Sequence, residues 1–355
     1  MVMTQTPQVP PFPEDVDVAV VSHNARATLP RLLECLMAAG TPRERITVYD
    51  VGSTDSTGDW LRTEWPGVIV KRLEENVGPD PGRNWALRDA TRPFLLLLDA
   101  DAYVRPDAPA RLRASLDTAA GVGMTTPVVV HTHQPDLLQY AAGGLHFICE
   151  AVNPFLDRPL VERGRDPRDI GAAPAVALLI DVSVAHRIGL WDDRYFIGKE
   201  DGDFCHRLRM GGFRLVEDPL AIVEHKSKPR SAWLFVPQIR NRWHFLLKNY
   251  EVRTLVVLAP ALLIHETLQA AMLIAKGHGG AWWQAIRQLL PWLRTLRAER
   301  AVIQGMRTVR DRDLLWVAPL IVRADLVGGG VGQSAKRLYD GWLAVYWRLA
   351  KVLIS

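Results

Sequence analysis

The sequence lacks the cysteine pattern of a disulfide-stapled or zinc-binding protein. Its three cysteines, Cys35, Cys149 and Cys205, are widely spaced and form no CxxC pair. This odd, dispersed set indicates neither a disulfide framework nor a zinc ribbon, and it fits a reducing cytoplasm. Residues 1–15 also lack a basic segment followed by an apolar run, so we expect no signal peptide. Their four prolines predict an extended lead-in.

A long uninterrupted apolar run is also missing. The most apolar stretch, Thr254–Ala275, contains Pro260, His265, Glu266 and Gln269. A charged side chain near the centre of a bilayer is costly, so the stretch predicts a buried or interfacial helix in preference to a spanning one. The composition, 48% hydrophobic and 23% charged over 355 residues, argues against wholesale disorder and against a polytopic membrane protein. We expect one large domain with a smaller appendage.

Charge is distributed unevenly along the chain. Residues 1–230 carry 26 Lys/Arg and 32 Asp/Glu, a balance of −6, whereas residues 231–355 carry 17 and 7, a balance of +10. The C-terminal region also holds eight of the twelve tryptophans: Trp233, Trp243, Trp282, Trp283, Trp292, Trp316, Trp342 and Trp347. A basic, tryptophan-rich region on an acidic body predicts an anionic membrane surface as partner. We expect no nucleic-acid partner.

The N-terminal half alternates between apolar strands and helices. Four short apolar runs predict strands at Val16–Val21, Ile46–Val51, Val68–Leu73 and Phe94–Leu98. Helical spacing predicts helices at Leu29–Met37, Thr57–Glu64 and Gly82–Ala90. Strands that are apolar throughout and alternate with helices predict an α/β fold, in which a mostly parallel sheet is covered on both faces.

Polar and acidic residues stand where these strands end, which is where ligands bind in such sheets. The most specific of these segments is Asp99-Ala100-Asp101, directly after four leucines. Two carboxylates one residue apart suit a divalent cation bound to a diphosphate, because the cation offsets their mutual repulsion. A DxD triplet alone is also common on solvated turns. The buried strand before it and the other strand-end acids favour a binding site.

Several further motifs accompany this triplet. The N-terminal ones are Val20-Val21-Ser22-His23-Asn24, Asp50-Val51-Gly52-Ser53-Thr54-Asp55, Asn76-Val77-Gly78 and Gly82-Arg83-Asn84. The later ones are Gly189-Leu190-Trp191-Asp192-Asp193-Arg194-Tyr195-Phe196, Glu200-Asp201-Gly202-Asp203, Gly211-Gly212-Phe213 and His225. Together they resemble the family 2 inverting glycosyltransferases of GT-A fold, in particular their bacterial rhamnosyltransferase-like branch. The resemblance covers residues 16–230 and implies a GT-A catalytic domain there. For residues 231–355, charge and apolar patterning predict a helical, membrane-associating region.

The resemblance implies a role for each matching residue. Asp201 would be the catalytic base, and Asp101 and His225 would hold a divalent cation, Mn²⁺ or Mg²⁺. The nucleotide-sugar donor would be bound by Ser22, Asn24, Asp50, Arg83 and Asp99. Glu200 and Trp191 would lie on the acceptor side. Two departures stand out: Val51 replaces the usual Asp or Asn, which leaves the nucleotide base open, and Pro79-Asp80-Pro81 predicts a stiff loop that narrows the donor pocket.

Elementary chemistry supports these roles. A sugar that leaves with a diphosphate develops negative charge there, which a cation neutralises. The attacking hydroxyl must lose its proton, and a carboxylate within hydrogen-bond reach can accept it. A single in-line displacement inverts the anomeric centre.

Simpler interpretations compete at individual positions. His225 can also be read as a core or surface histidine. Asp203 and Arg207 are four residues apart and predict an ion pair on one helix. His131 and His133 predict a loop and not a metal pair, since no carboxylate motif accompanies them. Asp192 and Asp193 predict turn residues before Tyr195.

The C-terminal region contains two amphipathic patterns. Apolar residues recur at helical spacing from Leu338 to Leu353 among Lys336, Arg337, Arg348 and Lys351. A similar pattern from Trp282 to Leu296 is interrupted by Pro291. Basic charge and tryptophan predict binding to the cytoplasmic face of a membrane, as a peripheral or monotopic protein. The alternative is packing on the catalytic domain or on a second subunit, as in a homodimer.

The predicted function is glycosyl transfer to a lipid-linked or membrane-proximal glycan, and two other functions compete with it. A sugar nucleotidyltransferase would require a glycine-rich phosphate loop with Arg or Lys near the N-terminus, and the sequence has none. A non-catalytic relative with the same fold would be expected to lose the DxD triplet or the base, and both are present. The sequence therefore predicts an enzyme.

Overall fold

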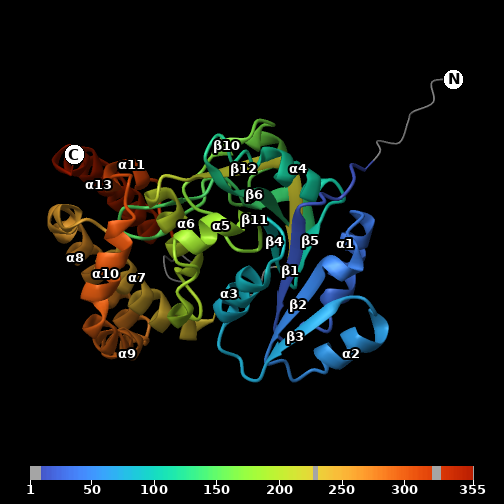
Figure 1. Cartoon of the computed structure of the whole chain (residues 1–355). Coiled ribbons are helices and arrows are strands. Elements are labelled where there is room, and N and C mark those ends of the chain that lie inside the picture. Colours follow the sequence, from blue (N-terminus) through green and yellow to red (C-terminus); the bar gives the residue numbers. More distant parts are fainter. Residues whose placement is uncertain (1–8, 227–230, 322–328, 355) are drawn as a thin grey trace.

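The computed structural model describes residues 9–226, 231–321 and 329–354 (Figure 1). The strands are β1 Val16–Ser22, β2 Ile46–Val51, β3 Ile69–Leu73, β4 Phe94–Asp99, β5 Ala102–Val104, β6 Val122–His131, β7 Gln134–Tyr140, β8 Gly144–Leu145, β9 Ala151–Val152, β10 Arg168–Asp169, β11 Ala177–Asp181 and β12 Arg214–His225. The helices are α1 Leu29–Ala38, α2 Thr57–Glu64, α3 Pro79–Asp89, α4 Ala108–Ser115, α5 Val182–Arg187, α6 Glu200–Met210, α7 Phe235–Asn249, α8 Val252–Ala275, α9 Gly279–Leu289, α10 Leu296–Gly305, α11 Asp311–Leu314 and α13 Gly330–Leu353.

A ten-stranded mixed sheet forms the centre of the N-terminal part. Its main path runs β10-β12-β6-β11-β4-β1-β2-β3, with β5 beside β12 and β7 beside β6. The four strands predicted from the sequence, β1 to β4, form one parallel block. Strand β11 runs antiparallel between β4 and β6, whereas β6 and β12 are parallel to each other. The α/β prediction is confirmed.

Both faces of the sheet are covered, as apolar strands require. Val18 and Val20 of β1 pack on one face with α1, α2 and α4. Ala19 and Val21 point to the opposite face, where α3, α5 and α6 lie. Alternate residues of a strand point to opposite sides, so a strand buried on both sides is apolar at every position.

The segment Pro79-Asp80-Pro81 differs from its prediction as a stiff loop. It forms the first turn of α3, which begins at Pro79 and not at Gly82. Proline fits the first helical turn because its fixed φ suits the helix and its missing N–H has no partner to lose there. The helix therefore starts early enough to bury Asp80 beside Arg83, one turn later.

The C-terminal helices pack on one another and on the catalytic part (Figure 1). Phe245 of α7 shares a core cluster with Phe147 and Cys149 and with Trp347 of α13. Among the described residues, α8 alone is long and apolar enough to cross a membrane, and 28% of its most apolar stretch is buried. The predicted amphipathic stretch Leu338–Leu353 lies within α13.

Residues 9–13 have no regular structure, and residues 1–8 of the predicted lead-in lie outside the described residues. Residues 227–230, at the predicted boundary between the catalytic and helical regions, also lie outside them. The boundary at Arg230 remains a prediction.

Candidate active site

Strand register brings the predicted donor-binding residues to one edge of the sheet. Ser22 pairs with Asp50, and Val21 pairs with Asp99, so the ends of β1, β2 and β4 coincide. The Asp50 carboxylate is fully buried, and its Oδ1 accepts a hydrogen bond of 3.0 Å from the Ser53 N–H. The other oxygen of Asp50 and the Ser22 hydroxyl have no hydrogen-bond partner among the described residues. Buried polar atoms without partners mark a place where a ligand can supply them.

Asn24 joins the two loops that follow β1 and β2. Its side-chain oxygen accepts from the Thr54 N–H at 2.8 Å, and its own N–H donates to the Ser53 hydroxyl at 2.8 Å. Asn24 has a φ of 49°, in the left-handed region that asparagine tolerates better than most residues. Asn24 therefore shapes the donor edge by fixing two loops.

Arg83 of α3 lies at the centre of the site. Its guanidinium donates to Asp80 at 3.0 Å, to Asp201 at 3.1 Å and to Asp99 at 3.2 Å. The Arg83 side chain is only 4% exposed. One buried cation thus links the donor-side Asp99 to the predicted base Asp201, although 101 residues separate these two in sequence.

Burial governs the ionisation of two carboxylates at this edge, Glu200 and Asp99. Burial raises the pKa of Glu200 to about 7, and Asp201 adds to the rise while Arg83 opposes it. Burial also raises the pKa of Asp99, where Arg83 opposes the rise and Asp101 adds to it. Uncompensated buried carboxylates are costly, and a divalent cation would relieve that cost.

Asp101 and His225 meet at the end of β12. His225 pairs in register with Ala102, the residue after Asp101. The His225 Nε2 lies 3.4 Å from the Asp101 Oδ1, close enough for both atoms to bind one ion. The carboxylate oxygen suits Mn²⁺ or Mg²⁺, the ions that the resemblance implied, and the imidazole nitrogen favours the transition metal of the two.

Asp201 is held by one interaction at each carboxylate oxygen. Oδ1 accepts from Arg83, and Oδ2 accepts from the Ala175 N–H at 3.0 Å. The side chain remains 26% exposed, so a ligand can approach it. Sequence reasoning missed the backbone donor at Ala175, because a main-chain N–H leaves no signature in residue type.

The backbone before Asp201 is held in unusual conformations. Phe196 and Lys199 have φ values of 59° and 74°, which non-glycine residues rarely adopt. The Asn241 side-chain nitrogen on α7 lies 3.0, 3.1 and 2.6 Å from the carbonyl oxygens of Tyr195, Ile197 and Gly198. Strained backbone persists only when its surroundings fix it, and α7 supplies that support.

The two residues predicted on the acceptor side lie differently from each other. Glu200 is 9% exposed and adjoins Asp201 at the start of α6. Trp191 is 3% exposed, and its ring stacks on Phe204 with centroids 3.7 Å apart. Trp191 lies in the core beneath the site, so it contacts Arg83 and not the open surface. Its acceptor role remains a prediction.

Other sequence interpretations have mixed outcomes. The ion pair between Asp203 and Arg207 is confirmed at 2.8 Å. His133 lies in a turn as expected, but His131 is the last residue of β6, so the loop prediction is wrong there. Asp192 is confirmed as a turn residue that accepts from the Arg194 N–H.

A second group of possible metal ligands lies between the catalytic part and the C-terminal helices. Asp192, His244 and Glu299 bring their ligand atoms within 4.8 Å of one another. Arg194 bonds both carboxylates, at 2.7 and 2.8 Å, and Lys248 lies 2.8 Å from Asp192. We call these five residues the interface cluster. Protein cations already occupy its acids.

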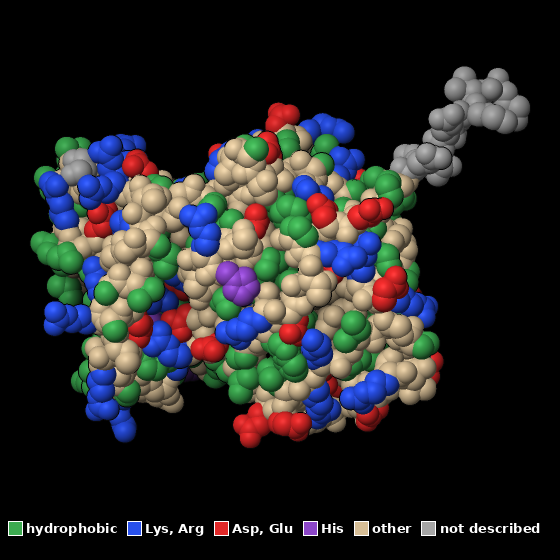
Figure 2. All heavy atoms as spheres, viewed as in Figure 1, with side chains coloured by type: hydrophobic (Ala, Val, Ile, Leu, Met, Phe, Trp, Pro, Cys, Tyr) green, Lys and Arg blue, Asp and Glu red, His purple; other side chains and the backbone are tan. Residues whose placement is uncertain are grey.

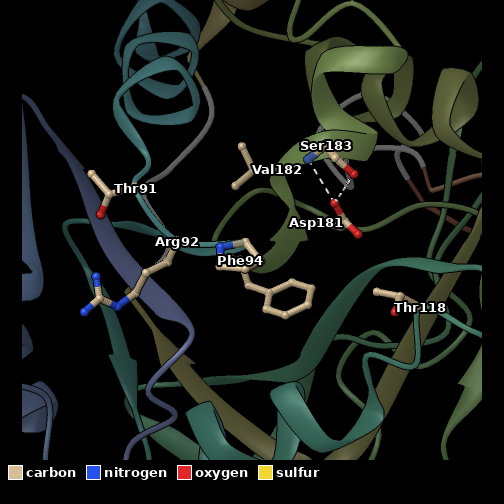
Figure 3. Close-up of a pocket in the computed structure, with 8 residues that line it drawn as sticks. Thr91, Arg92, Phe94, Thr118, Asp181, Val182 and Ser183 are labelled. Carbon is tan, nitrogen blue, oxygen red and sulfur yellow. Dashed lines mark hydrogen bonds between the residues drawn. The ribbon is translucent and has the colours of Figure 1, made fainter.

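A hollow of about 580 Å³ lies elsewhere, at the start of β4 (Figure 3). It is lined by Arg92, Phe94 and Asp181, at the opposite end of β4 from Asp99. The Asp181 carboxylate accepts from the Ser183 and Val184 N–H groups at the start of α5. Its acid thus serves as a helix cap, and the hollow contains none of the predicted site residues.

The chain is similar to known glycosyltransferases. The family model described as glycosyl transferase family 2 matches residues 17–140. The chain is 23% identical over 289 residues to the N-acetylglucosaminyl-diphospho-decaprenol L-rhamnosyltransferase of Mycobacterium tuberculosis, covering 71% of this chain and 94% of that protein. It is 26% identical over 352 residues to the pre-mycofactocin glycosyltransferase of the same organism, covering 96% of this chain and 67% of that protein.

Two further matches are partial. The succinoglycan biosynthesis protein ExoU of Rhizobium meliloti is 34% identical over 97 residues, but the match spans 26% of this chain and 28% of ExoU. The crystal structure of GalNAc-T7 with UDP, GalNAc and Mn²⁺ has a TM-score of 0.53 at 19% identity, over 67% of this chain and 48% of that one. At that identity the likeness concerns the fold. Residues 17–140 accordingly carry a glycosyl transferase family 2 domain, and the fold of the chain is similar to that of GT-A glycosyltransferases.

Proposed function

We propose that the protein is an inverting glycosyltransferase that moves a sugar from a nucleoside-diphosphate sugar to a lipid-linked or membrane-proximal glycan. The observation that carries this proposal is the Arg83 guanidinium, which bonds Asp99 on the donor side and Asp201 on the other. Because Asp99 and Asp201 are bonded to the same fixed cation, a donor bound beside one and an acceptor bound beside the other can meet there. Positioning of this kind supplies a large part of the rate enhancement of a two-substrate reaction.

The donor binds at the ends of β1, β2 and β4 in this proposal. Ser22 and Asp50 supply buried polar atoms that lack a hydrogen bond, although Arg72 lies 3.7 Å from the Asp50 oxygen, and Asn24 shapes the loop around them. Asp101 and His225 hold Mn²⁺ or Mg²⁺ through the oxygen and nitrogen that lie 3.4 Å apart. The cation, when bound, neutralises the charge that develops on the departing diphosphate. The GalNAc-T7 structure, which contains UDP and Mn²⁺, supports this assignment.

Asp201 acts as the general base. The acceptor hydroxyl oxygen forms a bond to the anomeric carbon, its proton passes to the Asp201 carboxylate, and the bond to the diphosphate breaks on the opposite face. Arg83 and the Ala175 N–H keep the carboxylate in one orientation. Glu200 lies beside it and is our prediction for the acceptor side, together with Trp191.

A transfer assay tests this function. Purified protein is incubated with a panel of nucleotide sugars, Mn²⁺ and a polyprenyl-diphosphate-linked sugar, and nucleoside diphosphate release is measured. We expect release with one donor, loss of release with EDTA, and a product whose anomeric configuration, measured by NMR, is inverted. Retention of configuration, or full activity in EDTA, contradicts the proposal. An acceptor without a lipid carrier, run in parallel, tests the acceptor class, since the pre-mycofactocin glycosyltransferase is also a relative.

We also propose that the C-terminal helices bind the cytoplasmic face of an anionic membrane peripherally. Exposed apolar side chains lie on α8 and α13 beside exposed basic ones, and Figure 2 shows both kinds at the edge of the molecule where these helices lie. The apolar ones include Leu263, Leu268, Val345 and Leu349. A basic surface with an apolar ridge fits an anionic bilayer.

Liposome flotation tests the membrane proposal. The variant Arg348→Glu/Lys351→Glu should float less with anionic vesicles, because each basic residue near such a surface contributes about 1 kcal/mol. The matched control Arg88→Glu/Arg165→Glu changes exposed arginines of the catalytic part and should float like the wild type. If the wild-type protein ignores anionic vesicles and forms a salt-resistant dimer, the surface is a subunit interface instead.

A further inference from the structure

His225 uses its two ring nitrogens in different directions. Nε2 points toward Asp101, whereas Nδ1 lies 2.6 Å from the side-chain oxygen of Gln139. A neutral imidazole carries its proton on one nitrogen only, so the partner of Nδ1 decides whether Nε2 keeps a lone pair. A metal ligand requires that lone pair. The residue that contacts Nδ1 therefore bears on metal binding.

Gln139 belongs to a chain of hydrogen bonds whose direction can be worked out. The Asp157 carboxylate lies 2.8 Å from the His131 Nε2, and an ionised carboxylate only accepts, so His131 carries its proton there. The His131 Nδ1 then accepts from the Gln139 amide nitrogen, at 3.4 Å. This places the amide oxygen toward His225, whose Nδ1 must donate. In the neutral imidazole, the His225 Nε2 is then left with its lone pair.

The backbone places Gln139 for this contact. Val129 pairs with Tyr140 and Val130 pairs with Leu138, so Gln139 is the extra residue of a bulge in the β6–β7 ladder. Bulges redirect side chains and are common beside active sites. Asn153 holds the Gln139 carbonyl with a 2.8 Å hydrogen bond, which fixes the bulge from the other side.

We propose that Gln139 is a positioning residue that holds His225 in the tautomer whose Nε2 lone pair faces the cation. Asp157 and His131 in turn fix the orientation of the Gln139 amide. The inference rests on the proposed role of His225 as a metal ligand. It gives a function to His131, which the sequence marked only as one member of an apparent pair.

The first test reads the tautomer directly in the metal-free protein. ¹⁵N-histidine labelling and NMR distinguish a protonated from an unprotonated ring nitrogen, and a His225→Ala spectrum assigns the signals. We expect wild-type His225 to carry its proton on Nδ1. Gln139→Ala should shift the proton toward Nε2, Gln139→Glu should keep it on Nδ1, and His133→Ala should change nothing. A wild-type His225 that is protonated on Nε2 overturns the proposal.

The second test measures Mn²⁺ affinity by calorimetry in the presence of a nucleoside diphosphate. Residues that orient a metal ligand typically change affinity 10- to 100-fold, so we expect Gln139→Ala to weaken binding by about tenfold or more. Gln139→Glu should recover most of the affinity, which a general folding defect would not allow. Wild-type affinity in Gln139→Ala, with Asp101→Ala defective, overturns this inference alone. No Mn²⁺ binding by the wild type overturns the proposed metal site as well.

Discussion

Two groups of acids and histidine in this protein have similar ingredients and opposite electrostatics. At the sheet edge, Arg83 lies 3.2 Å from Asp99, and the His225 ring lies 3.4 Å from Asp101. In the interface cluster, Asp192, Glu299 and His244 lie among Arg194 and Lys248. Ligand atoms gather in both places. Protein cations neutralise the acids of the interface cluster, whereas burial dominates the ionisation of Asp99 and Glu200 at the sheet edge.

The pKa directions follow this difference. Burial opposes ionisation of Glu299, but hydrogen bonds from Arg194 and Thr295 overcome it and lower its pKa to about 2. At the active site burial prevails, and the pKa of Glu200 rises to about 7. A cluster of potential ligands therefore indicates a cation site only when the surrounding cations do not balance it.

The largest expected effect concerns the base. Asp201→Asn should lower the transfer rate by about 10²- to 10⁴-fold, because the amide keeps the shape of the carboxylate but cannot accept the proton. Melting temperature and affinity for a nucleoside diphosphate should stay close to wild type. The exposed Asp169→Asn serves as a control with normal turnover. Near-normal transfer by Asp201→Asn removes it from the catalytic role.

The interface cluster should be essential for stability. Lys248 is 2% exposed and lies 2.8 Å from both Asp192 and Asp203. Lys248→Met leaves two buried carboxylates with one cation fewer. We expect the free energy of unfolding, measured with urea at pH 7, to fall by about 3–5 kcal/mol. The exposed pair of Arg214 with Asp169 provides the control, since Arg214→Met should cost less than about 1 kcal/mol. Equal losses in the two variants would contradict the comparison.

The two clusters should respond oppositely to pH. Because the pKa of Glu200 is raised, its contribution to folding stability is full below pH 4.5 and is lost as the pH rises through about 7. The free energy of unfolding of Glu200→Gln, relative to that of the wild type, should therefore rise by up to about 3 kcal/mol between pH 4.5 and 8. Ionised Glu299 stabilises the fold above pH 4.5, and this stabilisation is lost as the pH falls toward 2. The decrease in the free energy of unfolding that Glu299→Gln causes should therefore shrink at low pH. Parallel pH profiles of the two variants would refute this.

The smallest of the four expected effects is on metal affinity, which should fall when the sheet edge is changed and stay the same when the interface cluster is changed. Asp101→Ala should weaken Mn²⁺-dependent binding of a nucleoside diphosphate by at least about tenfold, because a direct ligand is lost. Glu299→Gln should leave it unchanged, since Arg194 already occupies that carboxylate. Calorimetry measures both. Unchanged affinity in Asp101→Ala would place the cation elsewhere.

Local patterns predicted the parallel half of the fold closely. The strand beginning at Phe94 and the helix Thr57–Glu64 were found within a residue of their predicted bounds, because wholly apolar runs and turn residues define them. The antiparallel insertion of β11 between β4 and β6 was not predicted. Strand pairing over such separations depends on tertiary packing and leaves no periodicity in the sequence.

The site was predictable in part. The DxD triplet could be identified as a candidate site from its position after a buried strand. The pairing of Asp101 with His225 came from family resemblance, since 123 residues separate them. Contacts made through the backbone, such as the Ala175 N–H to Asp201, carry no residue signature. Gln139 was missed because its importance arises from a bulge in the ladder.

The Asn241 side chain has a consequence for how such enzymes can be recombined. It lies on α7, beyond residue 230, yet it holds the carbonyls of Tyr195, Ile197 and Gly198 that precede the base. The segment before Asp201 therefore depends on a residue on the far side of position 230, so a cut there would divide one structural unit. A chimera that joins residues 1–230 to a foreign C-terminal region would inherit every predicted donor contact and lose the support of the backbone before Asp201, the proposed base.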